Sequence, residues 1–200
     1  MTNQILFKSG RVALSIAVAA VLWTGCRSQE PGQVTPIYNK DTGRLEQLVG
    51  SRQADGHIDV RAQMDGAHVR SVEIDRNHDG HPDRWEYYEA NATTHRSVLV
   101  RAEEANGAGA QITRREFYNS GVIERVEEDT DNDNRIDKWE TYEHGSLARM
   151  DLDLAGRGFP DRRLIYRPDG TLDRSESDPG GDGRFKGPAA DPTAAKPGRQ

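Results

Sequence analysis

The stretch DRNHDGHPDRWEYYE, residues 75–89, decides how the rest of the chain is interpreted. It places Asp or Asn at every second position, then a glycine, and then turns to aromatic residues that favour β-strands. A near copy, DTDNDNRIDKWETYE, occupies residues 129–143. With a period of 24 or 25 residues and one insertion near residues 91–95, the chain contains about six copies. They begin at Ser51, Asp75, Ala105, Asp129, Asp153 and Asp178.

Each copy predicts one β-hairpin. An acidic loop is followed by a strand-like run, a turn that contains glycine, and a second short run. The turn glycines are Gly66, Gly121, Gly145 and Gly170. The segment before Ser51 predicts the second half of a further copy, with Tyr38 at its tyrosine position. A single hairpin cannot bury a face, but stacked hairpins can, with Trp and Tyr packing between neighbouring units. We therefore expect an all-β fold, in which tandem hairpins of about 24 residues stack into an extended antiparallel sheet.

The first residues are typical of a targeting segment. Lys8 and Arg11 precede an apolar run at residues 12–22, which is shorter than the about 20 residues that span a bilayer. Cys26, the only cysteine, follows Gly25, and this arrangement resembles a bacterial lipoprotein signal. The resemblance implies that Cys26 is lipidated and anchors the chain to a membrane of the bacterial cell envelope, on the periplasmic or the outer surface. Trp23 departs from the aliphatic residue usual in that family, and the alternative is an ordinary signal peptide followed by a free cysteine.

The sequence thus divides into four segments. We expect a signal peptide at residues 1–25, a tether at 26–37, the hairpin repeats at 38–186 and a disordered tail at 187–200. The repeats are similar to those of MORN-like proteins and to Asp-rich, Trp-Glu-x-Tyr repeat lipoproteins of bacteria. This resemblance covers residues 38–185 and implies a stacked hairpin fold without implying an activity.

Composition restricts the function. The formal net charge is -6, and it becomes -8 from Cys26 onward, because Lys8 and Arg11 are lost and no acid precedes Glu30. An acidic chain argues against nucleic acid as a partner. Val, Ile, Leu and Phe make up only roughly 15% of residues 26–200, which argues against the deep core of an enzyme. The sequence contains no nucleophile elbow, zinc-binding HExxH or phosphate loop, so we expect no enzyme activity.

The two strong copies also resemble the calcium-binding loop of EF-hands. Counting each first Asp as position 1, both copies place oxygen ligands at positions 1, 3, 5, 9 and 12, and the carbonyl at position 7 would complete the set. In the first loop these residues are Asp75, Asn77, Asp79, His81, Asp83 and Glu86. In the second they are Asp129, Asp131, Asp133, Arg135, Asp137 and Glu140. At position 6 the second loop has Asn134 in place of Gly80, and Asn tolerates the left-handed backbone that glycine supplies.

Calcium is the expected ion, because it takes six to eight oxygen ligands and binding relieves repulsion between neighbouring carboxylates. Turn chemistry is the alternative, since Asp, Asn and Gly are also the residues of tight, solvated turns. The flanking segments alternate like strands, which favours the calcium loop without the helices of a true EF-hand. If they are strands, Glu86 and Glu140 point away from the ion.

These features predict an exported, lipid-anchored repeat protein with structural calcium-binding loops. It would act as an envelope or cell-surface interaction scaffold, whose protein or surface partner the sequence does not name. One alternative is a structural envelope lipoprotein whose acidic turns bind no metal, and another is a true EF-hand protein.

Overall fold

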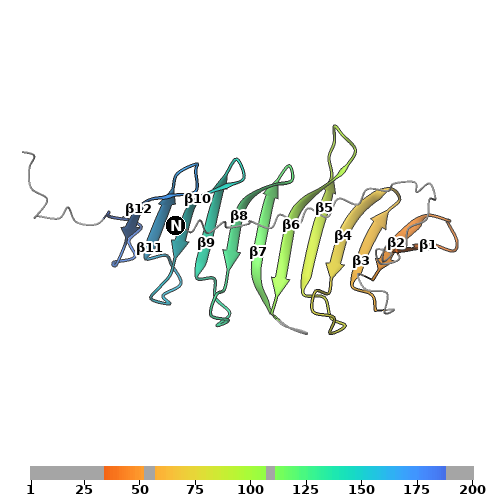
Figure 1. The fold of residues 1–200 in the computed structure, drawn as a ribbon, viewed down its shortest axis with the longest axis horizontal. Coiled ribbons are helices and arrows are strands. Elements are labelled where there is room, and N and C mark those ends of the chain that lie inside the picture. Colours follow the sequence, from red (N-terminus) through yellow and green to blue (C-terminus); the bar gives the residue numbers. More distant parts are fainter. Residues whose placement is uncertain (1–33, 52–56, 107–110, 188–200) are drawn as a thin grey trace, which may run out of the picture. The chain divides into compact units, whose positions relative to one another are not determined.

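The structure is a computed structural model, and it describes residues 34–51, 57–106 and 111–187. The described part is all-β, with twelve strands in one sheet, which confirms the predicted fold (Figure 1). The strands are β1 (Val34–Tyr38), β2 (Leu45–Gly50), β3 (Val60–Asp65), β4 (His68–Ile74), β5 (Arg84–Ala90), β6 (Ser97–Ala105), β7 (Ile112–Asn119), β8 (Val122–Glu128), β9 (Lys138–Glu143), β10 (Ser146–Leu152), β11 (Arg162–Tyr166) and β12 (Leu172–Ser177). Within these ranges, no helix has the length and apolarity that crossing a bilayer requires.

The strands follow one another across the sheet in chain order, and every neighbouring pair is antiparallel (Figure 1). Connections therefore alternate between the two ends of the strands, with the short hairpin turns at one end and the loops that begin at Ser51, Asp75, Ala105, Asp129 and Asp153 at the other. Residues 34–37, which the sequence assigned to a tether, belong to β1 and pair with β2. The signal peptide, Cys26, the rest of the tether and residues 188–200 of the tail lie outside the described residues.

Each hairpin repeats the same irregularity, at a tyrosine in five of them and at Met64 in the β3–β4 hairpin. The register shifts by one residue where Tyr38 pairs with Leu45, where Tyr88 pairs with Leu99, and at the equivalent pairs in later hairpins. Each of the four predicted turn glycines has a positive φ, between 61° and 83°. Such bulges increase the local twist of a strand, so the repeated sequence produces a repeated bend near the hairpin-turn end of the strands.

One face of the sheet, which we call the network face, holds the most buried side chains. Ala62, Val72, Ala102 and Val126 are at most 3% exposed, and they lie in one row across the strands. From Val72 onward glutamates alternate with them in that row, and a tyrosine two residues later on the same strand donates its hydroxyl to each glutamate. Tyr88, Tyr118 and Tyr142 donate to Glu86, Glu116 and Glu140, each at 2.7 Å.

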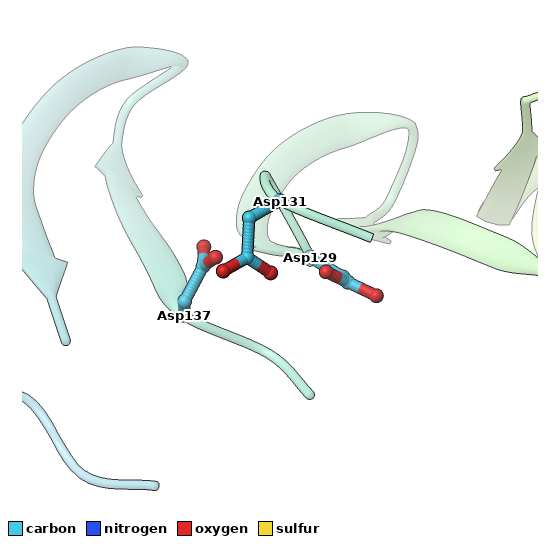
Figure 2. Close-up of side chains that lie close together, drawn as sticks. All are labelled: Asp129, Asp131 and Asp137. Atoms are coloured by element: carbon cyan, nitrogen blue, oxygen red, sulfur yellow. The ribbon is translucent and has the colours of Figure 1, made fainter. Parts of the chain in front are cut away.

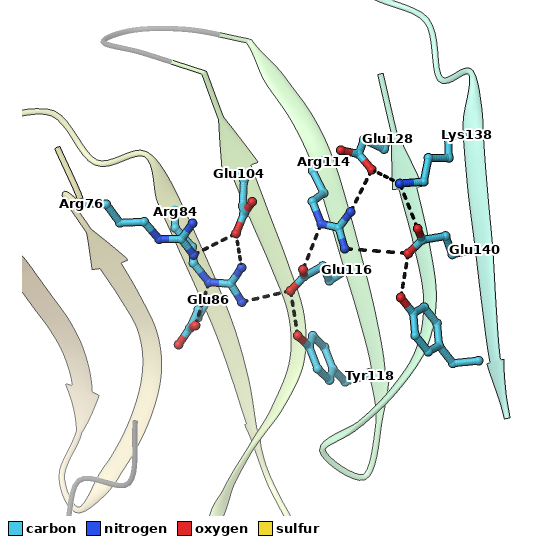
Figure 3. A network of polar contacts seen from close by, with 11 residues as sticks. Arg76, Arg84, Glu86, Glu104, Arg114, Glu116, Tyr118, Glu128, Lys138 and Glu140 are labelled. Carbon is cyan, nitrogen blue, oxygen red and sulfur yellow. Dashed lines mark hydrogen bonds and ion pairs between the residues drawn. The ribbon is translucent and has the colours of Figure 1, made fainter. Parts of the chain in front are cut away.

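Ion pairs connect these glutamates across five strands, from β5 to β9 (Figure 3). Arg84 Nη2 lies 3.0 Å from Glu116 Oε2, and Arg114 Nε lies 3.1 Å from the other oxygen of Glu116. Lys138 Nζ completes the series at 2.9 Å from Glu140. The described part of the sheet has no second layer. The ion-paired arginine, lysine and glutamate side chains therefore cover its small apolar residues.

Trp85 and Trp139 do not share this face with Tyr88, Tyr118 and Tyr142. Trp85 pairs with Glu103, and Trp139 pairs with Glu127 and Asp151, in a row on the opposite side of the sheet. Trp85 and Tyr88 stand three residues apart, as do Trp139 and Tyr142, and successive residues of a strand alternate between faces. The predicted aromatic packing is therefore divided between two faces rather than forming one ladder.

Candidate metal centre in the aspartate loops

Four aspartate loops share one backbone conformation. The residues at positions 4 and 6 have a positive φ in each loop, which includes His78 at 63°, Asn132 at 62° and Asn134 at 77°. The carboxylate at position 1 accepts backbone N–H groups from these turns. Asp75 accepts from His78 at 2.7 Å and from Gly80 at 2.8 Å. Asn134 thus adopts the left-handed conformation that the sequence predicted for it.

The same cap recurs in the loops that have lost most of their other acids. Asp153 accepts from the backbone of Arg157 and Gly158, and Asp178 from that of Gly181 and Gly183. Burial alone would raise the pKa of Asp153, but these backbone N–H groups hold the pKa below its ordinary value. Position 1 therefore maintains the turn in each of these four loops, whether or not the loop has the remaining ligands for an ion.

The loops are also joined to one another through the backbone. In each case the N–H at position 1 donates to the carbonyl of the residue at position 9 in the preceding copy. Asp75 donates to Asp59 at 2.8 Å, Asp153 to Asp137 at 2.8 Å and Asp178 to Asp161 at 2.8 Å. A change in one loop can thus affect the next, because a direct hydrogen bond connects them.

Positions 3 and 5 also have turn contacts of their own. Asp131 Oδ1 accepts from the N–H of Asp133 at 3.2 Å, and Asp133 Oδ1 accepts from that of Arg135 at 2.8 Å. Asn77 and Asp79 do the same in the first loop. Turn chemistry therefore accounts for the side chains at positions 3 and 5 as well as for the carboxylate at position 1.

Loop 129–137 brings three carboxylates together (Figure 2). One oxygen each from Asp129, Asp131 and Asp137 lies within 4.8 Å of the other two. Asp129 is buried, Asp137 is partly buried and Asp131 is exposed, so the group opens to solvent on one side. The described residues form no ion pair with any of the three, although the Thr130 hydroxyl donates to Asp137 at 2.8 Å. Three clustered carboxylates without a cationic side chain favour a bound cation.

Loop 75–83 does not gather its acids in this way within the described part of the chain. Position 3 is the neutral Asn77, whose amide donates to Asp79 Oδ2 at 3.1 Å. Position 2 is Arg76, whose Nε lies 3.9 Å from Asp83 Oδ1, a buried oxygen with no hydrogen-bond partner among the described atoms. His78 Nδ1 lies 2.8 Å from Asp59. Cationic and neutral side chains thus stand where the second loop has a threonine and an acid.

Loop 153–161 has a cationic side chain in place of a further acid. Arg157 is at position 5, where the first two loops have Asp, and its Nη2 lies 3.7 Å from Asp161 at position 9. A guanidinium of the same chain therefore supplies positive charge to this loop.

The glutamates at position 12 are not brought into either loop. Glu86 accepts from Arg84 at 2.9 Å and from the Tyr88 hydroxyl, and Glu140 contacts Lys138 and Tyr142 on the network face. This is the orientation expected if the segments after the loops are strands. Asp79 and Asp133 lie in their loops outside the three-carboxylate group, and the predicted carbonyl ligands of His81 and Arg135 stay predictions. Asp55 of the Ser51 copy lies outside the described residues.

The signal that separates the two strong loops is present in the sequence at positions 2 and 3. Position 2 is Arg76 in the first loop and Thr130 in the second, and position 3 is Asn77 and Asp131. A motif that scores only positions 1, 3, 5, 9 and 12 does not take position 2 into account. Comparison with known protein families and with curated proteins found no match for this chain.

Proposed function

We propose that this chain is an exported, lipid-anchored repeat scaffold of the bacterial cell envelope, in which loop 129–137 binds one calcium ion as a structural element. The observation that supports the metal is the group of Asp129, Asp131 and Asp137, with one oxygen of each within 4.8 Å of the others. Calcium suits such a site better than magnesium, because it accepts irregular sets of oxygen ligands, whereas magnesium retains water in a strict octahedron. The lipid anchor rests on Cys26 and the segment before it.

The position of the loop gives the ion a structural role. The N–H of Asp129 donates to Thr113 at 2.7 Å, and the carbonyl of Asp137 accepts from Asp153 at 2.8 Å. An ion held between Asp129 and Asp137 would therefore fix the loop to the copies on both sides. Because each unit of a repeat protein is stabilised mainly by its neighbours, such a link would stiffen the middle of the sheet.

A scaffold without metal is the second candidate. It is favoured by the complete set of backbone hydrogen bonds to Asp129, which accepts from Asp133 at 3.2 Å and from Asn134 at 3.0 Å. In that case the acids serve only as turn residues, as in loop 178–183.

Calorimetric titration of calcium into the chelator-stripped full chain distinguishes the two. We expect one saturable site, which Asp131→Asn weakens strongly and Asp182→Asn leaves intact, because Asp182 lies in a loop without the carboxylate group. Magnesium serves as the control ion. The absence of both binding heat and any calcium-dependent change in melting temperature would support the metal-free scaffold.

A further inference from the structure

The face opposite the network face carries a periodic row of arginines, and we call it the arginine face. Arg101, Arg125, Arg149 and Arg174 stand at one register position on β6, β8, β10 and β12. The residues between them in the row are Phe117, Thr141 and Ile165, and Tyr87 precedes the first arginine. Directly paired residues of an antiparallel sheet point to the same face. The four guanidinium groups therefore form a single row across the sheet.

The spacing of this row follows from the fold. Arginines on alternate strands recur at about 9.6 Å, which is twice the usual distance between strands, and the row from β6 to β12 is about 29 Å long. Their side chains are 42%, 46%, 44% and 53% exposed, so each reaches solvent to a similar extent. The row is an array of equivalent, accessible cations.

Neighbouring side chains hold the guanidinium groups in place. Arg101 stacks on Tyr87 at 4.2 Å and Arg125 on Phe117 at 3.9 Å from the ring centroid. Each arginine of the row also pairs with the acid two residues later on its own strand. These pairs are Arg101–Glu103, Arg125–Glu127, Arg149–Asp151 and Arg174–Glu176. A guanidinium has five N–H donors, and these contacts leave donors that can meet a ligand without reorganising the side chain.

Two adjoining rows at the centre of the arginine face differ in charge from the chain as a whole. In the Arg101 row and the adjoining row from Trp85 to Glu176, arginines outnumber acids by six to four. The arginines are Arg101, Arg115, Arg125, Arg149, Arg163 and Arg174, and the acids are Glu103, Glu127, Asp151 and Glu176. A locally positive surface on a chain of net charge -6 selects for an anionic partner that extends along it.

We propose that the arginine face binds a linear acidic polysaccharide that carries a carboxylate on every second sugar ring. The inference rests on the scaffold proposed above, for which it names the class of partner, but it needs neither calcium nor the lipid anchor. A carboxylate on every second ring recurs at the length of a disaccharide, which is comparable to the spacing of the arginines. Each carboxylate then meets one guanidinium in a charge-assisted hydrogen bond.

The spacing and the shape of the row favour this partner over nucleic acid. A duplex carries one charge per about 1.7 Å of its axis, far denser than the arginine row. Neighbouring strands of a sheet are rotated by about 20–25°, so the row winds across the face. A flexible linear polymer can follow such a path, and its sugar hydroxyls can bond the acids that stand beside the arginines.

The test is binding of fluorescein-labelled hyaluronan oligosaccharides to the full chain at low ionic strength in EDTA, measured by fluorescence polarisation. Hyaluronan has one carboxylate per disaccharide, and dextran is the neutral control. We expect affinity to rise with length up to about four disaccharides, one for each arginine of the row, and then to level off.

Arg125→Gln/Arg149→Gln should weaken binding by about tenfold, because two solvent-exposed ion pairs with the ligand are lost. The matched control is Arg70→Gln/Arg184→Gln, which changes the net charge equally at exposed arginines outside the row, and it should stay within about twofold. Arg125→Lys/Arg149→Lys keeps the charge and should bind between the two.

Three outcomes would overturn the proposal: no binding by the unmodified chain, equal weakening in the row and control variants, or equally tight binding of polyglutamate of matched length, which indicates an acidic polypeptide. Because EDTA removes calcium, these outcomes are independent of the calorimetric test of loop 129–137.

Discussion

Loops 75–83 and 129–137 follow the same acidic pattern and have the same backbone turns, yet they differ in which side chains lie beside their carboxylates. In the second loop Asp131 joins two further carboxylates, and Thr130 beside it is neutral. In the first loop Asn77 replaces one acid, and Arg76 lies 3.9 Å from the Asp83 carboxylate. A loop conformation and a cluster of carboxylates are thus separable properties: positions 1, 4, 6 and 9 set the turn, whereas positions 2 and 3 determine whether uncompensated charge collects there.

The largest expected effect comes from giving the second loop the arginine of the first. Thr130→Arg places a guanidinium beside Asp137, so we expect loss of calcium binding. For the unmodified chain, calcium at a hundred times its Kd should stabilise the fold by about 2.7 kcal/mol and raise the Tm by about 5–10 °C. The variant should lose this increase in a thermal melt. Thr93→Arg, in an exposed hairpin turn, adds the same charge elsewhere and should retain it.

The reverse exchange tests whether positions 2 and 3 are sufficient. Arg76→Thr/Asn77→Asp removes the arginine near Asp83 and adds, at position 3 of the first loop, the carboxylate that corresponds to Asp131. We expect the calorimetric stoichiometry to increase from one calcium ion per chain to about two. If the stoichiometry stays at one, contacts outside these two positions control the first loop.

A smaller effect is expected at position 12. Glu140→Gln should leave calcium stoichiometry unchanged, because Glu140 contacts Lys138 and Tyr142 rather than the carboxylate group of the loop. The loss of one buried charged partner should lower the free energy of unfolding by about 2 kcal/mol, as measured by urea denaturation. Loss of calcium binding without a change in stability would instead identify Glu140 as a ligand.

The smallest expected effect is the pH dependence of stability that the glutamates of the network face contribute. Burial acts to raise the pKa of Glu116, but the Tyr118 hydroxyl and the charges of Arg84 and Arg114 lower it below its ordinary value. The pKa of Glu140 is lowered likewise by Tyr142, Lys138 and Arg114. A carboxyl whose folded pKa is below its unfolded value, about 4.3, stabilises the fold above that pH and loses this contribution as the pH falls through the folded pKa.

In EDTA, the Tm should therefore decline with decreasing pH below about pH 4.3, and Glu116→Gln should reduce the slope of that decline. Equal slopes in the unmodified chain and in Glu116→Gln would show that the network face does not titrate in this range.

The 24-residue period by itself determined the strand order. Because each copy supplies two strands, a glycine turn and an acidic turn, neighbours in the chain must be neighbours in the sheet. Local sequence also determined the left-handed backbone of Asn134, since Asn tolerates that conformation. It likewise determined the place of Tyr38 in the first hairpin, since its segment follows the order of elements common to the copies.

Only the tertiary structure decided what distant side chains do together. Glu86 and Glu140 fit a ligand motif by their spacing, but alternation along a strand turns them to the network face, where Tyr88 and Tyr142 hydroxyls meet them. The arginine row could not be predicted from the sequence, because Arg101, Arg125 and Arg149 are 24 residues apart and only the strand register aligns them. Sequence period fixes which strands are adjacent, whereas register and the alternation of side chains between two faces fix which charges meet.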